Sequence, residues 1–182
     1  DAESARDLYL QSLDENPDNY EMWLRVVDID WKMKDYQSAV KHVERALEMF
    51  PNQAELYLFQ GSAHYLLGEY QQALDLLETG KIYALDDKLI TQFSAQLGDV
   101  YHQLGQYQES DQAYTEVLTR DPENLHVLNN YSYYLALRKE KLDKAREMAA
   151  KLVKLAPDQP NYLDTYGWVL YTSGKYNEAR KL

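Results

Sequence analysis

The sequence predicts an all-α fold, a solenoid of stacked antiparallel helix pairs. The first observation is a short string that recurs as LLGEYQQAL at 66–74, QLGQYQES at 103–110 and TSGKYNEA at 172–179, with a copy lacking the glycine at 32–40. The second is that small residues and prolines recur in the same phase, and the third is apolar residues at helical spacing. A single helix pair cannot bury its apolar face alone, so neighbouring pairs must stack.

The tyrosines of the string set the repeat length. Tyr36, Tyr70 and Tyr107 lie 34 and then 37 residues apart, and Tyr176 follows 69 residues later, which is two repeats and one residue. KEKLDKA at 139–145 fills the gap. A fixed period of this size is typical of helical repeat proteins.

Small residues recur at two phases, which lets neighbouring helices approach closely. The first set is Gly61, Gly98, Ser132 and Gly167, and the second is Ala5, Ala39, Ala73, Ser110, Ala145 and Ala179. The prolines near the ends of helical stretches are Pro17, Pro51, Pro122 and Pro157.

This pattern resembles the tetratricopeptide repeat family, in which Trp, Leu-Gly, Tyr, Ala, an aromatic, Ala and Pro recur over 34 residues. The residues that carry the match are Trp23, Ala39, Ala46 and Pro51 in one unit and Leu97, Gly98, Tyr101, Tyr114 and Pro122 in another. The resemblance covers essentially the whole chain. It implies a right-handed α-α superhelix. The repeats are rich in tyrosine and asparagine, which is similar to bacterial members of the family. Several of those members are tethered in the cell envelope, and by that analogy alone an envelope location is favoured over the cytoplasm.

The repeat phase divides the chain into units. Residues 1–19 form the second helix of a preceding unit, and the units that follow are 20–53, 54–90, 91–124, 125–159 and the truncated 160–182. Three extra residues fall in the second of these units and one in the fourth. Since both ends fall inside a unit, we expect a piece of a longer array, or ends that pack on other domains.

Turn and cap residues are expected at helix ends. Glycine has no Cβ, and Gly68, Gly105 and Gly174 therefore suit the left-handed residue after a helix. Asp18, Asp87 and Asp121 lie ahead of helices and are predicted to accept first-turn N–H groups.

Composition narrows the classes of function. The 182-residue chain has no Cys and a net charge of −11, which argues against nucleic-acid binding, and no apolar run approaches a membrane span. The charge is uneven: residues 1–137 hold 24 acids and 9 bases, and residues 138–182 hold 6 acids and 10 bases. The chain lacks a phosphate-binding loop and the common hydrolase motifs, so neither an enzyme nor a cofactor is predicted.

The histidines do not predict a metal site. His64 takes a packing position of the repeat, while His42 and His126 are expected at the surface. No carboxylate lies at a convincing ligand spacing from His64 or His102.

The resemblance implies that first helices line a concave groove, which would be aromatic and rich in amides. The predicted groove residues are Leu24, Asp28, Trp31, Leu58, Ser62, Tyr65, Asp99, His102, Asn129, Asn130, Tyr133, Trp168 and Tyr171. Some family members grip a peptide carboxylate with Lys, Arg and Asn, but the matching positions here hold Leu24, Asp28 and Gln96. The groove is therefore predicted to bind a peptide or partner protein by apolar contact, with Asn129 and Asn130 bonding its backbone. The alternative is that these aromatic side chains pack on one another between units.

A second functional hypothesis is a structural spacer in a larger assembly, joined through its ends, by end-to-end self-association, and through a basic patch. The predicted patch consists of Arg138, Lys139, Lys141, Lys144, Arg146, Lys151 and Lys154. The alternative is that these charged residues simply lie on solvent-exposed helix faces and bind no partner.

Overall fold

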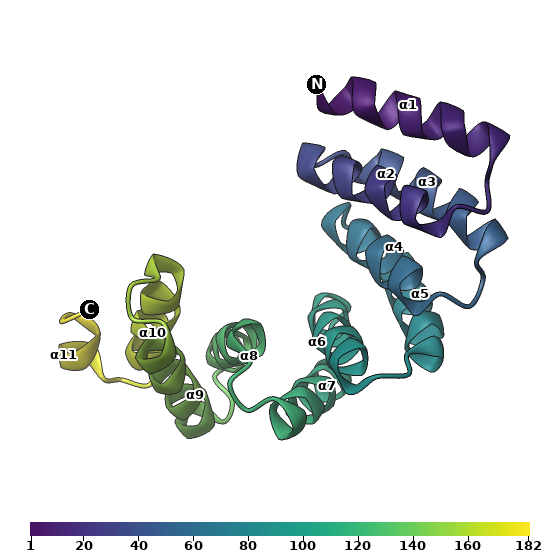
Figure 1. The fold of residues 1–182 in the computed structure, drawn as a ribbon. Helices are drawn as coiled ribbons and strands as arrows, with labels where there is room; N and C mark the ends of the chain where they lie inside the picture. The colour runs from purple at the N-terminus through teal and green to yellow at the C-terminus, as the bar shows by residue number, and fades with distance from the viewer. The chain divides into compact units, whose positions relative to one another are not determined.

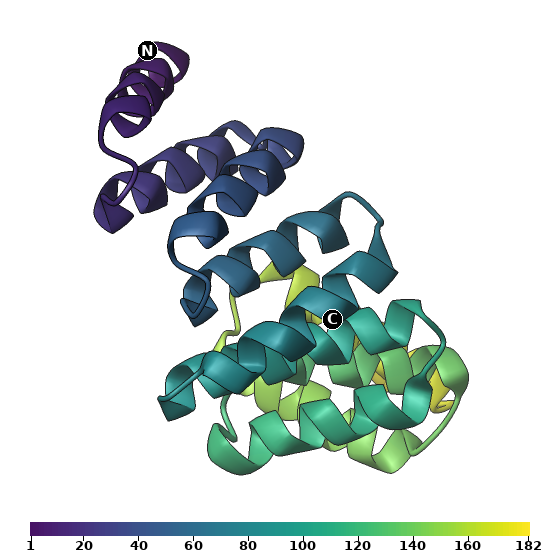
Figure 2. The ribbon, with the colours of Figure 1, turned by 90° about the vertical axis from the view of Figure 1, so that its right-hand side faces the viewer.

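The computed structural model describes residues 1–182 as eleven helices without strands. They form two compact units, Asp1–Leu104 and Gly105–Leu182, each of which is described by itself. The prediction of an all-α fold of stacked helix pairs is confirmed within each unit (Figures 1 and 2).

The N-terminal unit contains six helices. They are α1 (Ala2–Glu15), α2 (Tyr20–Met33), α3 (Tyr36–Met49), α4 (Ala54–Leu66), α5 (Tyr70–Tyr83) and α6 (Asp87–Gln103). Each helix packs against the next, and α4 also contacts α6. The second helices α3 and α5 therefore each lie between two first helices.

The C-terminal unit contains five helices. They are α7 (Tyr107–Arg120), α8 (Leu125–Arg138), α9 (Leu142–Leu155), α10 (Pro160–Thr172) and α11 (Tyr176–Ala179). Helix α9 packs against both α8 and α10, which also contact each other. The boundaries of the individual repeats stay a prediction.

The turns follow the recurring string. Gly68, Gly105 and Gly174 have φ angles of 79°, 74° and 75°, as predicted. Where the string lacks glycine, Lys34 and Lys139 adopt the same left-handed conformation, at φ 57° and 56°. The turn geometry is therefore kept even where the residue that favours it is replaced.

The predicted N-caps are wrong by one to three positions. The side chains that accept a first-turn N–H are those of Asn19, Asp86 and Asn124, from Met22, Leu89 and Val127 respectively. A cap must directly precede the first helical residue for its side chain to reach back to the N–H groups. Asp87 is already inside α6, and Asp121 instead accepts from the Asn124 side chain at 3.0 Å.

Close helix approach depends on small residues. A Cβ built on Gly61 of α4 would lie 2.6 Å from Leu77 Cγ on α5, and one built on Gly80 would overlap Tyr57 Cβ and the Phe93 ring. Trp23 is 1% exposed, and its indole N–H donates to the Pro17 carbonyl at 2.8 Å. The repeat phase thus places the Trp23 ring in the core.

A buried ion-pair cluster joins the first three helices. Asp30 of α2 is fully buried; it accepts from Arg6 of α1 at 2.8 Å, and its other oxygen lies 2.7 Å from His42 Nδ1 on α3. The hydrogen bond to Asp30 raises the pKa of Arg6, which also pairs with Asp35 at 3.1 Å. The prediction that His42 lies at the surface is wrong, because its partner comes from a neighbouring helix.

Candidate functional site

Of the exposed aromatic side chains of the C-terminal unit, three lie on the contacting helices α8 and α10. Tyr133 of α8 is 37% exposed, and Trp168 and Tyr171 of α10 are 39% and 56% exposed. The Trp168 and Tyr171 rings stack with centroids 6.0 Å apart. We call Tyr133, Trp168 and Tyr171 the aromatic face.

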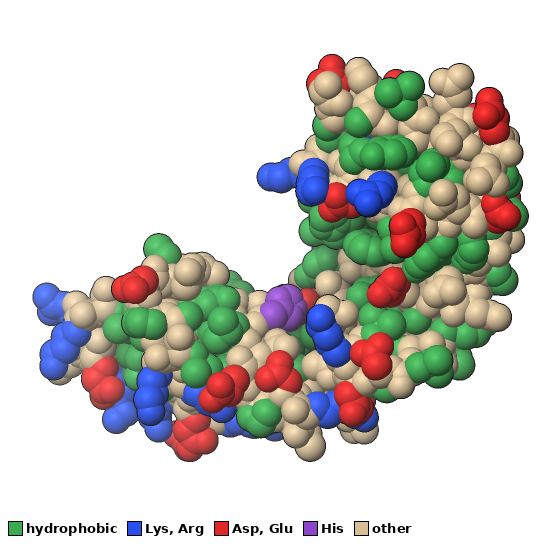
Figure 3. All heavy atoms as spheres, viewed as in Figure 1, with side chains coloured by type: hydrophobic (Ala, Val, Ile, Leu, Met, Phe, Trp, Pro, Cys, Tyr) green, Lys and Arg blue, Asp and Glu red, His purple; other side chains and the backbone are tan.

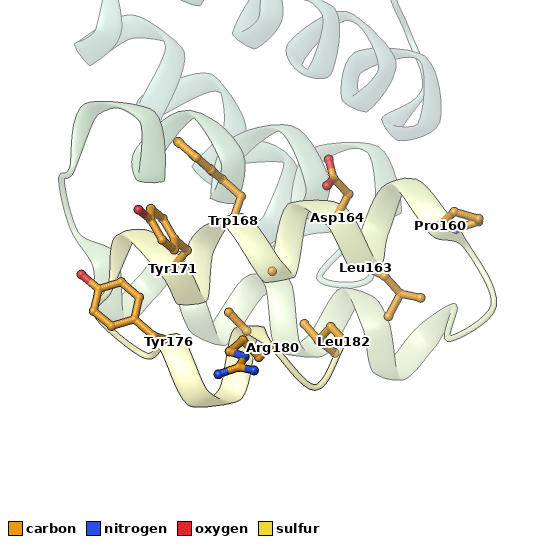
Figure 4. Close-up of a pocket in the computed structure, with 10 residues that line it drawn as sticks. Pro160, Leu163, Asp164, Trp168, Tyr171, Tyr176, Arg180 and Leu182 are labelled. Atoms are coloured by element: carbon orange, nitrogen blue, oxygen red, sulfur yellow. The ribbon is translucent and has the colours of Figure 1, made fainter.

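Helix α10 presents two different sides. Figure 4 shows Asp164 and Trp168 pointing to one side of the helix and Leu163 to the other, where Leu182 also lies. A groove of about 930 Å³ runs along the helix, and its lining is mostly apolar. Trp168 and Tyr171 of the aromatic face line this groove together with Gly167 and Leu182.

Polar side chains tie the two helices of the aromatic face together. The Thr165 hydroxyl on α10 donates to Asn129 Oδ1 on α8 at 2.8 Å, and Asn129 Nδ2 donates to Asn130 Oδ1 at 3.0 Å. Asn130 Nδ2 also lies 3.4 Å from His126 Nε2. The Thr165–Asn129 hydrogen bond links α10 to α8, a contact that the pattern of a single helix could not show.

In the N-terminal unit, the predicted groove residues fall into three groups. Asp28 is exposed and pairs with Lys32 at 2.6 Å, and together with Leu24 it lines a shallow hollow on α2. Ser62 and Asp99 are only 8% and 3% exposed, so their side chains offer no surface to a partner. The half-buried members are Leu24, Trp31, Leu58, Tyr65 and His102.

Some half-buried aromatics of this unit contact one another. Trp31 meets Tyr36 and Phe59 edge-on at 5.3 Å and 6.0 Å, and Tyr65 lies 5.6 Å from Tyr70. Packing between helices therefore accounts for part of the aromatic content of the predicted groove.

The predicted basic patch is largely paired within its own unit. Arg138 is only 9% exposed; it bonds Asp111 at 2.6 Å, and its guanidinium lies 4.8 Å from the centre of the Tyr107 ring. Lys141 also pairs with Asp111 at 2.6 Å. Burial raises the pKa of Asp111, but hydrogen bonds from Lys141 and Arg138 outweigh it and lower that pKa overall.

Further patch residues also have partners. Lys144 lies 3.2 Å from the Tyr131 hydroxyl, Lys151 donates to the Pro122 carbonyl at 2.7 Å, and Arg146 pairs with Asp143 at 3.0 Å. Lys139 and Lys154 are exposed. Figure 3 shows acidic side chains interspersed among the basic ones near α9.

No group of three or more His, Asp or Glu side chains is placed to hold a metal ion. His64 is 13% exposed, and its Nδ1 lies 2.6 Å from Glu69 Oε2. None of the helices is both long and apolar enough to cross a membrane.

Sequence reasoning missed some exposed apolar residues. Leu8 of α1 is 67% exposed, and Ile82 and Leu85 near the end of α5 are 80% and 95% exposed. Leu85 lies in the connection between α5 and α6, within the unit that the repeat phase makes three residues longer. Nothing in the sequence indicated that Leu8 is exposed, because the same repeat position is half-buried or buried in the other second helices.

Comparison with known proteins identifies the family. Tetratricopeptide repeat models match residues 27–84 and 92–124. The chain is 30% identical over 159 residues to the TPR repeat-containing protein PA4667 of Pseudomonas aeruginosa, covering 87% of this chain and 26% of that protein. It is 33% identical over 91 residues to the SGT1 homolog of Oryza sativa, covering 50% of this chain and 25% of that protein. The chain thus spans about a quarter of the length of these curated relatives.

Solved structures agree on the fold. PilW, a type IV pilus biogenesis factor, superposes with a TM-score of 0.85 at 17% identity, over 100% of this chain and 82% of that one. YrrB superposes with a TM-score of 0.70 at 16% identity, over 94% of this chain and 86% of that one. The sequence matches and the helix stacking together show that the chain belongs to the tetratricopeptide repeat family, whose members are protein-interaction modules.

Proposed function

We propose that this chain binds a segment of a partner protein on its aromatic face, without a carboxylate clamp. The observation that carries the proposal is the exposure of Tyr133, Trp168 and Tyr171. The same unit buries Tyr114 and Tyr131 to 0% and 1% exposure, so it has the means to bury large rings. Exposed aromatic side chains on a rigid support are frequent anchors of protein interfaces.

The side chains of the aromatic face favour apolar contact with a partner, with one polar group at the edge of the face. The Trp168 and Tyr171 rings present a stacked surface, and Asp164 lies one helical turn before Trp168 on the same side (Figure 4). The clamp positions hold Leu24, Asp28 and Gln96, so a terminal carboxylate would find no cation at these positions. A partner segment with apolar side chains and a complementary basic or amide group fits this face.

The supporting residues act through position. Asn129 accepts from Thr165 and donates to Asn130, so it fixes the spacing between α8 and α10 and with it the spacing between Tyr133 and Trp168. YrrB, one of the similar structures, is described as a TPR protein with an unusual peptide-binding site, which supports a peptide ligand for this fold. In the N-terminal unit, the proposal extends to the accessible predicted residues Leu24, Asp28, Trp31, Leu58, Tyr65 and His102.

The proposal is tested with immobilised chain and its single variants. Trp168→Ala and Tyr133→Ala remove anchors, and we expect each to weaken capture of the partner by roughly tenfold or more, as truncation of a buried interface anchor does. Leu155→Ala is the matched control, because Leu155 of α9 is 39% exposed in the same unit but lies outside the aromatic face.

The readout is the set of captured proteins and their apparent affinities, with circular dichroism to show that each variant is folded. Capture of the same partners with the same affinity by wild type, Trp168→Ala and Tyr133→Ala would remove the aromatic face from the proposal. A loss shared equally by Leu155→Ala would count against it in the same way, since the effect would then be unspecific.

The spacer hypothesis receives less support from the charged residues. Five of the seven predicted patch residues have partners within the C-terminal unit, which leaves Lys139 and Lys154 as the exposed members without a described partner. We propose no catalytic activity for this chain, in keeping with a family of protein-binding modules.

A further inference from the structure

A second groove, of about 850 Å³, runs between α7 and α9 of the C-terminal unit. Both helices pack on α8 (Figure 1), and Tyr131 of α8, which is 1% exposed, lies at the base of the groove. Tyr131 and Tyr133 are two residues apart, which is about 200° around a helix. The groove and the aromatic face therefore lie on different sides of α8.

The α7 side of the groove is polar but mostly uncharged. Its uncharged residues recur four, three and four positions apart, as on one side of a helix: Gln108, Gln112, Thr115 and Thr119. The Thr115 and Thr119 hydroxyls donate to carbonyls one turn earlier on α7, at 2.7 Å and 2.8 Å. Gln108 and Gln112 are exposed, so their amide groups can donate to a ligand and accept from it.

The acidic side chains of the groove already have cationic partners. Asp111 accepts from Lys141 and from Arg138, each at 2.6 Å. Glu116 lies 3.7 Å from Arg120, one turn later on the same helix. Neither carboxylate is therefore left to balance a further positive charge in the groove.

Two lysines of α9 face α7 without forming an ion pair. The Lys144 ammonium donates to the Tyr131 hydroxyl at 3.2 Å and lies 4.5 Å from the centre of its ring. Lys151 donates to the carbonyl of Pro122, just after the end of α7, at 2.7 Å. These partners are neutral, and both lysines are half-buried. Since the chain has 30 acids and only 19 bases, a shortage of carboxylates does not explain this arrangement.

The positions of the two lysines suit a ligand that carries several negative charges. Lys144 and Lys151 are seven residues apart, so they lie on one side of α9 with about 10 Å between them along the helix axis. A single small anion does not span that distance. An extended peptide rises about 3 Å per residue, so a second carboxylate reaches it after about three residues.

The charge of the whole unit also suits an acidic ligand. Residues 105–182 carry 11 acids and 11 bases, whereas residues 1–104 carry 19 acids and 8 bases. The C-terminal unit therefore does not repel an acidic ligand by its net charge. Complementary charge at the groove speeds encounter and selects the partner.

We propose that the groove between α7 and α9 binds an acidic segment of a partner protein in an extended conformation. The carboxylates of this segment pair with Lys144 and Lys151, and the Gln108 and Gln112 amides bond its backbone. This surface is built on second helices and uses no residue of the aromatic face, so it is a binding site beyond the proposed function.

Fluorescence anisotropy of a dye-labelled peptide of six glutamates, titrated with the 182-residue chain, tests the proposal. A peptide of six glutamines is the neutral match, and we expect the glutamate peptide to bind at least about tenfold more tightly, with an affinity that falls as salt is added. Lys144→Gln and Lys151→Gln each remove one charge and should weaken binding roughly fivefold, and the double variant should lose more than either.

The controls separate the groove from net charge and from the aromatic face. Lys175→Gln removes the same charge from the same unit but lies outside the groove, and it should bind the glutamate peptide as wild type does. Trp168→Ala should also bind it as wild type does, because Trp168 does not line this groove. Circular dichroism shows that each variant is folded.

The proposal is overturned if the glutamate peptide binds no more tightly than the glutamine peptide, or if Lys144→Gln and Lys151→Gln bind it as wild type does. An equal loss in Lys175→Gln overturns it too, because the effect then reports only net charge. Displacement of the peptide by inorganic phosphate at the same concentration would overturn it as well, by assigning the groove to small anions.

Discussion

Substitution of Gly80 by alanine tests whether close helix approach holds the N-terminal unit together. Gly80 of α5 faces Tyr57 of α4 and Phe93 of α6. A Cβ at this position would overlap Tyr57 Cβ and would lie 2.8 Å and 2.9 Å from two atoms of the Phe93 ring. Tyr57 Cβ is fixed to its backbone and Phe93 is fully buried, so a helix must move to make room.

The magnitude follows from two opposing effects. Overpacking of a tight core costs about 1–3 kcal/mol, and the double contact places Gly80→Ala at or above the upper end of that range. Replacing glycine by alanine inside a helix contributes about 1 kcal/mol in the other direction. The expected net loss in the free energy of unfolding is therefore roughly 2 kcal/mol.

The assay is urea denaturation followed by circular dichroism, and Gly167→Ala is the comparison variant. A Cβ on Gly167 meets only Leu182 at 4.0 Å, so this variant keeps the helix-propensity gain and should be as stable as wild type or more stable. If Gly80→Ala unfolds at the same urea concentration as Gly167→Ala, close approach at Gly80 is not limiting and the reasoning is refuted.

Two further predictions concern the charged clusters. Asp30→Ala leaves Arg6 and His42 without their buried partner and should cost about 3–5 kcal/mol in the free energy of unfolding, measured by denaturation; a loss below that of an exposed ion pair such as Asp28–Lys32 would contradict it. The pKa of Asp111 is lowered in the folded chain, so its contribution to stability is present above the unfolded pKa of about 3.9 and is lost as pH falls through the folded pKa. Asp111→Asn should therefore flatten the fall of stability below that pH, and an unchanged acid profile would count against the pairing.

Much of the fold could be predicted from the sequence because its information is local and repeated. The string around Tyr70 and Tyr107 fixes helix ends, and Gly68 and Gly105 take the left-handed conformation expected of them. Trp23 lies in the core as its repeat position indicates.

The candidate site was less predictable, since side-chain pairing across helices carries no repeat signal. His42 looks like a surface residue along α3, and only the approach of Asp30 from α2 explains its burial. Arg138 and Lys141 look like part of a free basic patch until Asp111, 27 and 30 residues earlier, is placed beside them. The periodicity of a single helix shows which of its sides faces inward, but it does not show which charged residue of a neighbouring helix lies opposite.

The two buried ion-pair clusters also bear on how a repetitive chain avoids misfolding. Arg6 and Asp111 occupy the same repeat position but carry opposite charge, and each meets the opposite charge on the helix that follows it, Asp30 for one and Arg138 for the other. Repeats that resemble one another can exchange neighbours during folding. Exchange here would bring Arg6 against Arg138 or Asp111 against Asp30, and burial of like charges costs several kcal/mol. The opposite polarity of these two clusters therefore disfavours an exchange between the helix pairs that carry them.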